Sequence, residues 1–156
     1  MNKSTSGFTI VEIAVVVVII SILATLVTVG FNRTQADTRD TLRSSRTTVI
    51  ANALEKYYDE NGDYPSCSSL TQSGSVVANS VLAGIDPATL LTPKSAAAAT
   101  NSISCADLTT TTGPDTYAYI GDGTASCSTG AACTRWTLKY IDEGSNQIKT
   151  ISSQHK

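Results

Sequence analysis

A single carboxylate stands inside the most apolar part of the chain. Residues 8–31 form a run of 24 residues whose only charged member is Glu12. A charged side chain at the centre of a membrane helix costs about 2.5–3.5 kcal/mol on insertion scales, and less toward the helix end, where Glu12 lies. No basic residue within the run can neutralise this carboxylate. Glu12 therefore needs a cation from outside the run, and its position indicates ion pairing in a low-dielectric environment.

The other reactive side chains form no recognisable catalytic set. The one histidine, His155, stands next to the last residue, where chains commonly fray, so we expect neither a histidine-based triad nor a histidine metal site. Asp107, Asp115 and Asp122 are acid–base candidates, but nothing in the sequence brings them together. The formal net charge of −2 offers no basic excess for nucleic acid. We therefore expect no enzyme activity, no cofactor and no metal site.

The apolar run is long enough to cross a membrane as a helix. At about 1.5 Å per residue it spans roughly 36 Å, against a hydrocarbon core of about 30 Å. Its β-branched residues favour a strand in water, but within lipid a helix satisfies its own backbone hydrogen bonds. A cleaved secretory signal would have a shorter apolar core and an A-x-A-like site, which this sequence lacks. An ordinary signal anchor remains the simpler alternative, but it does not explain why a carboxylate lies in the apolar run.

The residues at the start of the run suggest a more specific interpretation. Residues 7–12, with the sequence GFTIVE, resemble the processing site of type IV prepilins and the related pseudopilins. The resemblance implies that residues 1–7 are a leader, cut off by a prepilin peptidase between Gly7 and Phe8, and that Phe8 is then N-methylated. Lys3 in the leader fits a cytoplasmic location. The new amine on Phe8 would be the missing cation for Glu12, within one chain or between subunits, so Phe8 and Glu12 are the expected assembly residues.

The helix is expected to continue beyond the membrane as far as residue 61. Residues 32–61 contain no proline and carry apolar side chains at spacings of three, four or seven residues, the pattern of an amphipathic helix. Asn61-Gly62 and the following Pro65 mark its end. Four arginines in this section alternate with acidic residues: Arg33, Arg39, Arg43 and Arg46. This alternation favours a solvated face, or ion pairs between subunits, over binding of lipid or nucleic acid.

Residues 62–156 are predicted to form a head domain that begins with irregular structure. Residues 76–82 are a candidate short helix. Residues 86–91 are another, with Asp86 as its cap and Pro87 in its first turn. The low-complexity stretches 96–99 and 109–112 are expected to be loops.

The last third of the chain predicts strands. Residues 135–141 alternate with a period of two, which is typical of a half-buried strand, and residues 117–120 and 148–151 are the other two candidate strands. We expect about three antiparallel strands that pack over the second section of the helix and bury Trp136 and Leu138. The predicted fold class is therefore α+β: a long N-terminal membrane-spanning helix under a small antiparallel sheet, the layout that the pilin resemblance also implies.

The four cysteines all lie in the predicted head: Cys67, Cys105, Cys127 and Cys133. An even number in an exported domain favours two disulfides, although four cysteines allow three connectivities. Proximity along the chain suggests Cys67–Cys105 and Cys127–Cys133, and each bridge would contribute roughly 2–4 kcal/mol. The intervals of 37, 21 and 5 residues between successive cysteines lack the short pairs of structural zinc sites.

The resemblance implies a structural function. The expected role is a subunit of a type IV pilus or pilus-like filament, single-pass in the inner or cytoplasmic membrane before assembly and at the cell surface afterwards. The expected partners are identical or related pilins, the prepilin peptidase and methyltransferase, the pilus assembly machinery and the membrane, with nucleic acid possible only at the level of the filament. A pseudopilin of a type II secretion or DNA-uptake system is the alternative. A single-pass membrane-anchored binding protein or enzyme is a more distant one. Only Asp142 and Glu143 cluster late in the chain, which is weak support for a calcium site.

Overall fold

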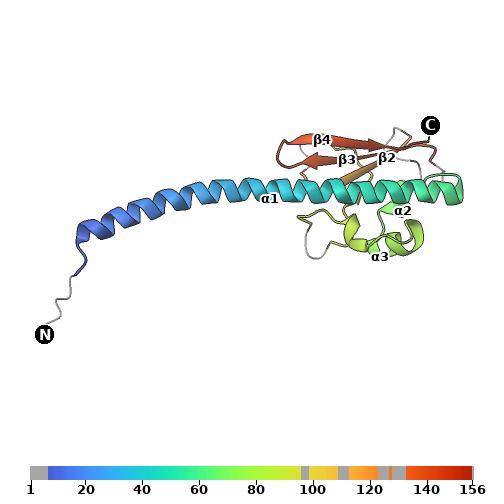
Figure 1. Ribbon diagram of the computed structural model, residues 1–156. Helices are drawn as coiled ribbons and strands as arrows, with labels where there is room; N and C mark the ends of the chain where they lie inside the picture. The colour runs from blue at the N-terminus through green and yellow to red at the C-terminus, as the bar shows by residue number, and fades with distance from the viewer. Residues whose placement is uncertain (1–6, 96–98, 109–112, 123–126, 128–132, 156) are drawn as a thin grey trace. The chain divides into compact units, whose positions relative to one another are not determined.

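The computed structural model describes residues 7–95, 99–108, 113–122, 127 and 133–155 (Figure 1). In chain order the elements are α1 (Ile10–Asn61), α2 (Cys67–Leu70), α3 (Gly74–Val76), the π-helix η1 (Val77–Val81), the 3-10 helix η2 (Pro87–Leu90), β1 (Ile103–Ser104), β2 (Tyr117–Gly121), β3 (Trp136–Asp142) and β4 (Gln147–Ser152). The chain divides into two compact units, Met1–Ala36 and Asp37–Lys156, and the boundary falls inside α1.

Helix α1 is one element of 52 residues. It contains no proline, so nothing removes a backbone donor from its interior. It ends at Asn61 because Gly62 adopts a left-handed conformation (φ +81°) and donates its N–H to the carbonyl of Tyr58 at 2.7 Å. A glycine in this conformation is a common end to a helix, so the expected stop at Asn61-Gly62 is present.

The sheet has four strands in the order β1-β2-β3-β4. Strands β2, β3 and β4 are antiparallel neighbours: Tyr119 pairs with Leu138, and Leu138 pairs with Ile151. The expected antiparallel strands are therefore present, but the sheet is mixed, because the two-residue β1 pairs parallel with β2. A strand this short carries no periodic pattern, which is why the sequence did not predict it.

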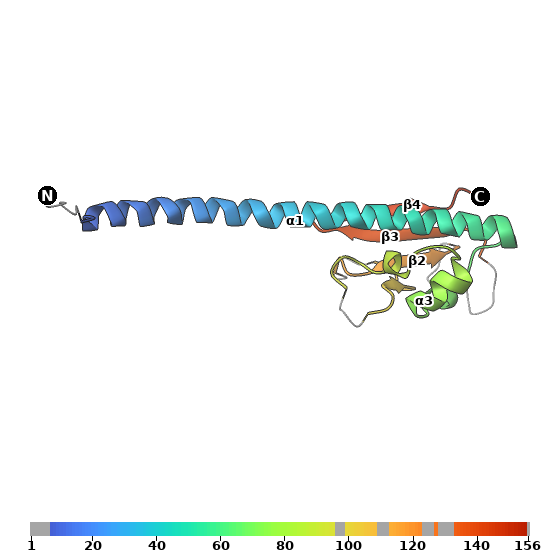
Figure 2. The ribbon, with the colours of Figure 1, turned by 60° about the horizontal axis from the view of Figure 1, so that its bottom comes forward.

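The core of the second unit lies between α1 and the sheet. Figures 1 and 2 both show the sheet alongside the second half of α1. Ile50 and Leu54 of α1 belong to the same buried cluster as Tyr119, Trp136 and Leu138 from the strands. The stripe at helical spacing on α1 and the period-two alternation of β3 thus face each other. The strand side chains expected to be buried are buried.

The segment between α1 and the sheet contains more helix than expected. Of residues 76–82, predicted as a short helix, 76–81 lie in α3 and η1 and Leu82 follows the end of η1, while α2 was not predicted. η2 begins as expected, because the Asp86 side chain accepts a hydrogen bond from the N–H of Ala88 at 2.9 Å and Pro87 follows the cap. The loop expected at 109–112 and most of the one at 96–99 lie outside the described residues.

Candidate functional site

The predicted processing site lies just before α1. Gly7 and Phe8 belong to no helix or strand, and α1 begins at Ile10. Both residues are exposed, and 87 % of the Phe8 surface is accessible. A β-carbon placed on Gly7 would meet no atom within 4 Å. The peptide bond between Gly7 and Phe8 is therefore in non-helical, accessible backbone.

Glu12 is held by Thr9 at the first turn of the helix. A carboxylate oxygen of Glu12, Oε2, accepts hydrogen bonds from the backbone N–H of Thr9 at 2.8 Å and from its hydroxyl at 2.7 Å. In return, the N–H of Glu12 donates to the Thr9 hydroxyl oxygen at 3.2 Å, and the N–H of Ile13 donates to the Thr9 carbonyl at 3.3 Å. This reciprocal arrangement is a capping box with Thr9 as the N-cap and Glu12 as the third helical residue. The sequence analysis missed Thr9, although T-x-x-E before an apolar run predicts such a box.

In a single copy of the chain, the apolar side chains in the first part of α1 are exposed. Side chains such as Val15, Ile20 and Leu23 are each more than half exposed. Two of the hydroxyls along this stretch bind the helix backbone: Ser21 donates to the carbonyl of Val17 at 2.7 Å, and Thr25 donates to that of Ser21 at 2.6 Å. By length and composition α1 is able to cross a membrane, and these internal hydrogen bonds suit a lipid environment.

A network of charged side chains joins α1 to the turn between β3 and β4. Arg43, which is fully buried, donates to Asp40 Oδ1 at 2.6 Å, to Glu143 Oε2 at 3.2 Å and to the carbonyl of Pro114 at 3.2 Å. Glu143 also accepts from Arg39 at 2.8 and 2.9 Å and from Lys94 at 2.6 Å. Each guanidinium and carboxylate is thus paired inside the head, as partly buried charges require.

This network corrects the expectation for the arginines. Arg39 and Arg43 bind the head instead of forming a solvated or intersubunit face, and Arg46 donates to the carbonyl of Leu91 at 2.7 Å. The spacing of arginines and carboxylates on α1 fits a solvent-exposed surface equally well. The carboxylate that binds Arg39 and Arg43, Glu143, lies about a hundred positions away along the chain, so no local pattern indicates it. Arg33 belongs to the other unit.

The same contacts set the pKa of the carboxylates. Hydrogen bonds from Arg39 lower the pKa of Glu143 from 4.5 to about 2; burial opposes the change, and Lys94 and Arg43 add to it. For Asp40, burial would raise the pKa, but hydrogen bonds from the backbone N–H groups of Glu143 and Gly144 and from Arg43 leave it lowered. The oxygens of Glu143 are thus occupied by cationic side chains, so the weak case for calcium at residues 142–143 gains no support. Among residues whose placement is described, no group of three or more metal-ligating side chains was found.

A second carboxylate, Glu55, accepts hydrogen bonds from donors in three other segments. It accepts from the hydroxyl of Tyr64 at 2.8 Å, from Nε1 of Trp136 at 3.2 Å and from the N–H of Gln154 at 3.1 Å, and Nε2 of His155 lies 3.6 Å away. Burial, and then the bond to Glu55, raise the pKa of Tyr64. Glu55 therefore ties the C-terminal segment and the loop after α1 to the helix. No local sequence signal marks it, because Trp136 and Gln154 are distant in the chain.

Three of the acidic and histidine candidates from the sequence, Asp107, Asp122 and His155, make structural contacts. Asp107 pairs with Lys139 at 2.8 Å. Asp122, in a left-handed turn, accepts from the N–H of Arg135 at 2.9 Å. His155 stacks on Tyr58 with ring centroids 4.3 Å apart. Each of these side chains has a structural partner that accounts for its position.

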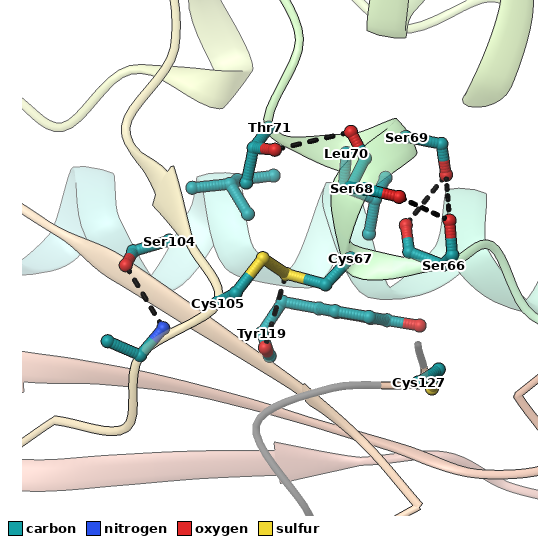
Figure 3. The surroundings of a disulfide bond; sticks show 12 residues. Ser66, Cys67, Ser68, Ser69, Leu70, Thr71, Ser104, Cys105, Tyr119 and Cys127 are labelled. Atoms are coloured by element: carbon teal, nitrogen blue, oxygen red, sulfur yellow. Dashed lines mark hydrogen bonds between the residues drawn. A yellow bond between two sulfur atoms is a disulfide. The ribbon is translucent and has the colours of Figure 1, made fainter. Parts of the chain in front are cut away.

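The structure joins each cysteine to its neighbour along the chain. Cys67 of α2 is bonded to Cys105, just after β1, with Cα atoms 5.7 Å apart. Figure 3 shows this bridge over Tyr119, whose carbonyl oxygen lies 3.7 Å from the sulfur of Cys67. Cys127 is bonded to Cys133, with Cα atoms 5.8 Å apart. A β-carbon on Gly121 of β2 would overlap both sulfurs of that second bridge, so only glycine fits there.

Comparison with known proteins agrees with the geometry of the N-terminal segment. Residues 2–28 match the family model described as the prokaryotic N-terminal methylation motif. No curated protein and no solved structure matches the chain. The match includes Gly7, Phe8 and Glu12, the residues on which the sequence interpretation depends. This motif points to a structural protein, and together with the apolar helix it fits anchoring in a membrane. The chain therefore carries, at its N-terminus, the signature of type IV pilins and pseudopilins.

Proposed function

We propose that this chain is a structural subunit of a type IV pilus or pilus-like filament, made as a membrane-anchored precursor. The observation that carries the proposal is the methylation motif at residues 2–28 on a helix whose apolar side chains are exposed within the chain. A single copy leaves this surface uncovered, so it needs lipid before assembly and neighbouring helices afterwards. The proposed parts are a leader (1–7), a core helix (8–31), its continuation (32–61) and a head (62–156).

Processing would take place at the bond between Gly7 and Phe8. In the cleavage, water adds to the carbonyl carbon of Gly7, the bond to the nitrogen of Phe8 breaks, and Phe8 is left with a free amine. Transfer of a methyl group from a sulfonium donor, with loss of a proton, leaves an amine that is still cationic. The accessible backbone of Gly7 and Phe8 supports this site, because a peptidase needs a bond that is not enclosed in a helix.

Assembly would depend on Glu12 and the amine of Phe8. The nitrogen that receives the positive charge belongs to the residue directly before Thr9, whose own N–H lies 2.8 Å from Glu12 Oε2. The carboxylate is thus close enough to neutralise the amine of its own chain in the membrane. When subunits stack, the amine of a neighbouring chain can take this place, because an unpaired charge among apolar helices is strongly unfavourable.

Two measurements test the proposal. Mass spectrometry of the native protein should find a chain that begins at N-methylated Phe8. Electron microscopy of cells should show long surface fibres for a pilus subunit, whereas processing without such fibres would favour the pseudopilin of a secretion or DNA-uptake system. A native chain that still begins at Met1 would overturn both forms of the proposal.

A Glu12→Ala variant tests the pairing. We expect it to insert, because removing a charge lowers the cost of insertion, and to be cleaved, although more slowly, because it also loses the hydrogen bonds from Thr9. For an equal amount of cleaved chain, we expect at least tenfold fewer filaments in sheared-cell preparations. Glu60→Ala is the matched control, since it removes an exposed carboxylate near the other end of α1 whose ion pair with Lys56 is long, at 3.8 Å. Normal filament yield from Glu12→Ala would refute the pairing.

A further inference from the structure

The capping box at the start of α1 lies directly beside the bond proposed for cleavage. Thr9 is the residue at which the helix begins, and only Phe8 separates it from Gly7. Three hydrogen bonds between Thr9 and Glu12, at 2.7, 2.8 and 3.2 Å, define this helix start. Thr9 is therefore close enough to the bond to influence its conformation. The methylation motif, as a family signature, assigns such a role to no single side chain.

The leader offers other places at which the helix could begin. Ser4, Thr5 and Ser6 are all residue types that serve as N-caps. Gly7, Phe8 and Thr9 stand three positions after them, so none of the three has an acidic partner there. Thr9, with Glu12 three positions on, is the one residue from 4 to 9 that can form the complete box. A helix begun at Ser6 or earlier would include the bond between Gly7 and Phe8.

We propose that Thr9 is a positioning residue for processing: its capping box with Glu12 fixes the helix start after the cleavage site and so keeps the Gly7–Phe8 bond in non-helical, accessible backbone. A peptide bond inside a helix has its N–H and C=O engaged by the helix, whereas a peptide bound along its length presents both groups to the partner. Without the box, the N–H of Glu12 needs a new acceptor, and extending the helix by one residue supplies the carbonyl of Phe8. A second residue of extension brings the carbonyl of Gly7, which belongs to the scissile bond, into a hydrogen bond with the N–H of Val11. The inference rests on the proposed function, because it concerns the same cleavage.

The test is the rate of cleavage of the full-length precursor in detergent micelles by a purified prepilin peptidase, followed by intact mass. Thr9→Val keeps the shape of the side chain and the backbone N–H that binds Glu12, but it loses the two hydrogen bonds that use the hydroxyl, so the complete box cannot form. We expect its kcat/KM to fall about fivefold, the change that corresponds to loss of a typical cap at about 1 kcal/mol. Thr9→Ser and Thr9→Asn both supply a side-chain acceptor and should keep the rate within twofold of the wild type.

The two rescue variants separate capping from other roles of Thr9. If the peptidase recognises the threonine itself, Thr9→Asn will be as slow as Thr9→Val, and the inference is overturned. Equal or faster cleavage of Thr9→Val would also overturn it. Failure of the proposed function looks different, because in that case the wild-type precursor is not cut between Gly7 and Phe8. Circular dichroism of all variants in micelles checks that α1 is retained.

Discussion

Replacement of Glu143 by glutamine tests how the head is fastened to α1. Glu143 lies in the turn after β3 and binds Arg39, Arg43 and Lys94 at distances from 2.6 to 3.2 Å. Glutamine has nearly the same size and can still accept a hydrogen bond, but it has no charge. The buried guanidinium of Arg43 would keep Asp40 as its ion-pair partner and lose the second one. The variant therefore weakens the contact between turn and helix without creating a cavity.

The magnitude follows from the pKa of Glu143. The arginine and lysine contacts lower it from 4.5 to about 2, and at about 1.4 kcal/mol per pH unit this corresponds to an upper limit of about 3 kcal/mol at neutral pH. Because 18 % of the side chain remains exposed, solvent screening reduces the expected loss to about 2 kcal/mol. A lowered pKa in the folded state stabilises above pH 4.5. The contribution is lost as the pH falls toward 2, so the two proteins should converge there.

Urea unfolding of the full chain in micelles, followed by fluorescence, measures this difference. Trp136 is the one tryptophan in the sequence and is buried in the core of the head, so it reports on that unit. Glu60→Gln is the matched control: Glu60 and Lys56 are each 60 % exposed and 3.8 Å apart, and we expect a change within about 0.5 kcal/mol. If Glu143→Gln costs no more than Glu60→Gln at pH 7, or if its deficit persists unchanged at pH 2.5, the reasoning is wrong.

Two further substitutions test the other fixed points of the head. Gly121→Ala should prevent the bridge between Cys127 and Cys133, because the added β-carbon would lie 1.9 Å from the sulfur of Cys127. Thiol labelling of the denatured variant without reductant should then find two free thiols per chain. The control Gly113→Ala, where the space around the added β-carbon is open, should show none. Glu55→Gln should release the C-terminal segment and lower stability by about 1–3 kcal/mol, because it leaves buried donors without a charged acceptor. Amide exchange of residues 153–155 should then rise at least tenfold, whereas Glu60→Gln, which removes an exposed carboxylate whose ion-pair partner is Lys56, should leave it unchanged.

The N-terminal helix could be predicted because its signals are local. The unbroken apolar run, the absence of proline and the Asn61-Gly62 stop each act through the nearest turns of the chain, and α1 ends where they indicate. The capping box is equally local, and T-x-x-E predicts it once Glu12 is considered as a hydrogen-bond acceptor for Thr9 as well as a charge in need of a cation. The strand at 135–141 likewise carries its own alternation, and β3 contains most of it; the candidate strands at 117–120 and 148–151 lie in β2 and β4.

The arrangement of the head depends instead on contacts that local patterns do not encode. The same arginines on α1 could face water, a neighbouring subunit or the interior, and folding places Arg43 in the interior because Glu143 reaches it from the far end of the chain. Glu55 is equally inconspicuous in the sequence until Trp136 and Gln154 are brought to it. Periodicity and caps thus specify which residues form α1 and the main strands. The choice of partner for each buried charge follows from the tertiary packing, since a carboxylate takes the nearest cation in space, whatever its distance along the chain.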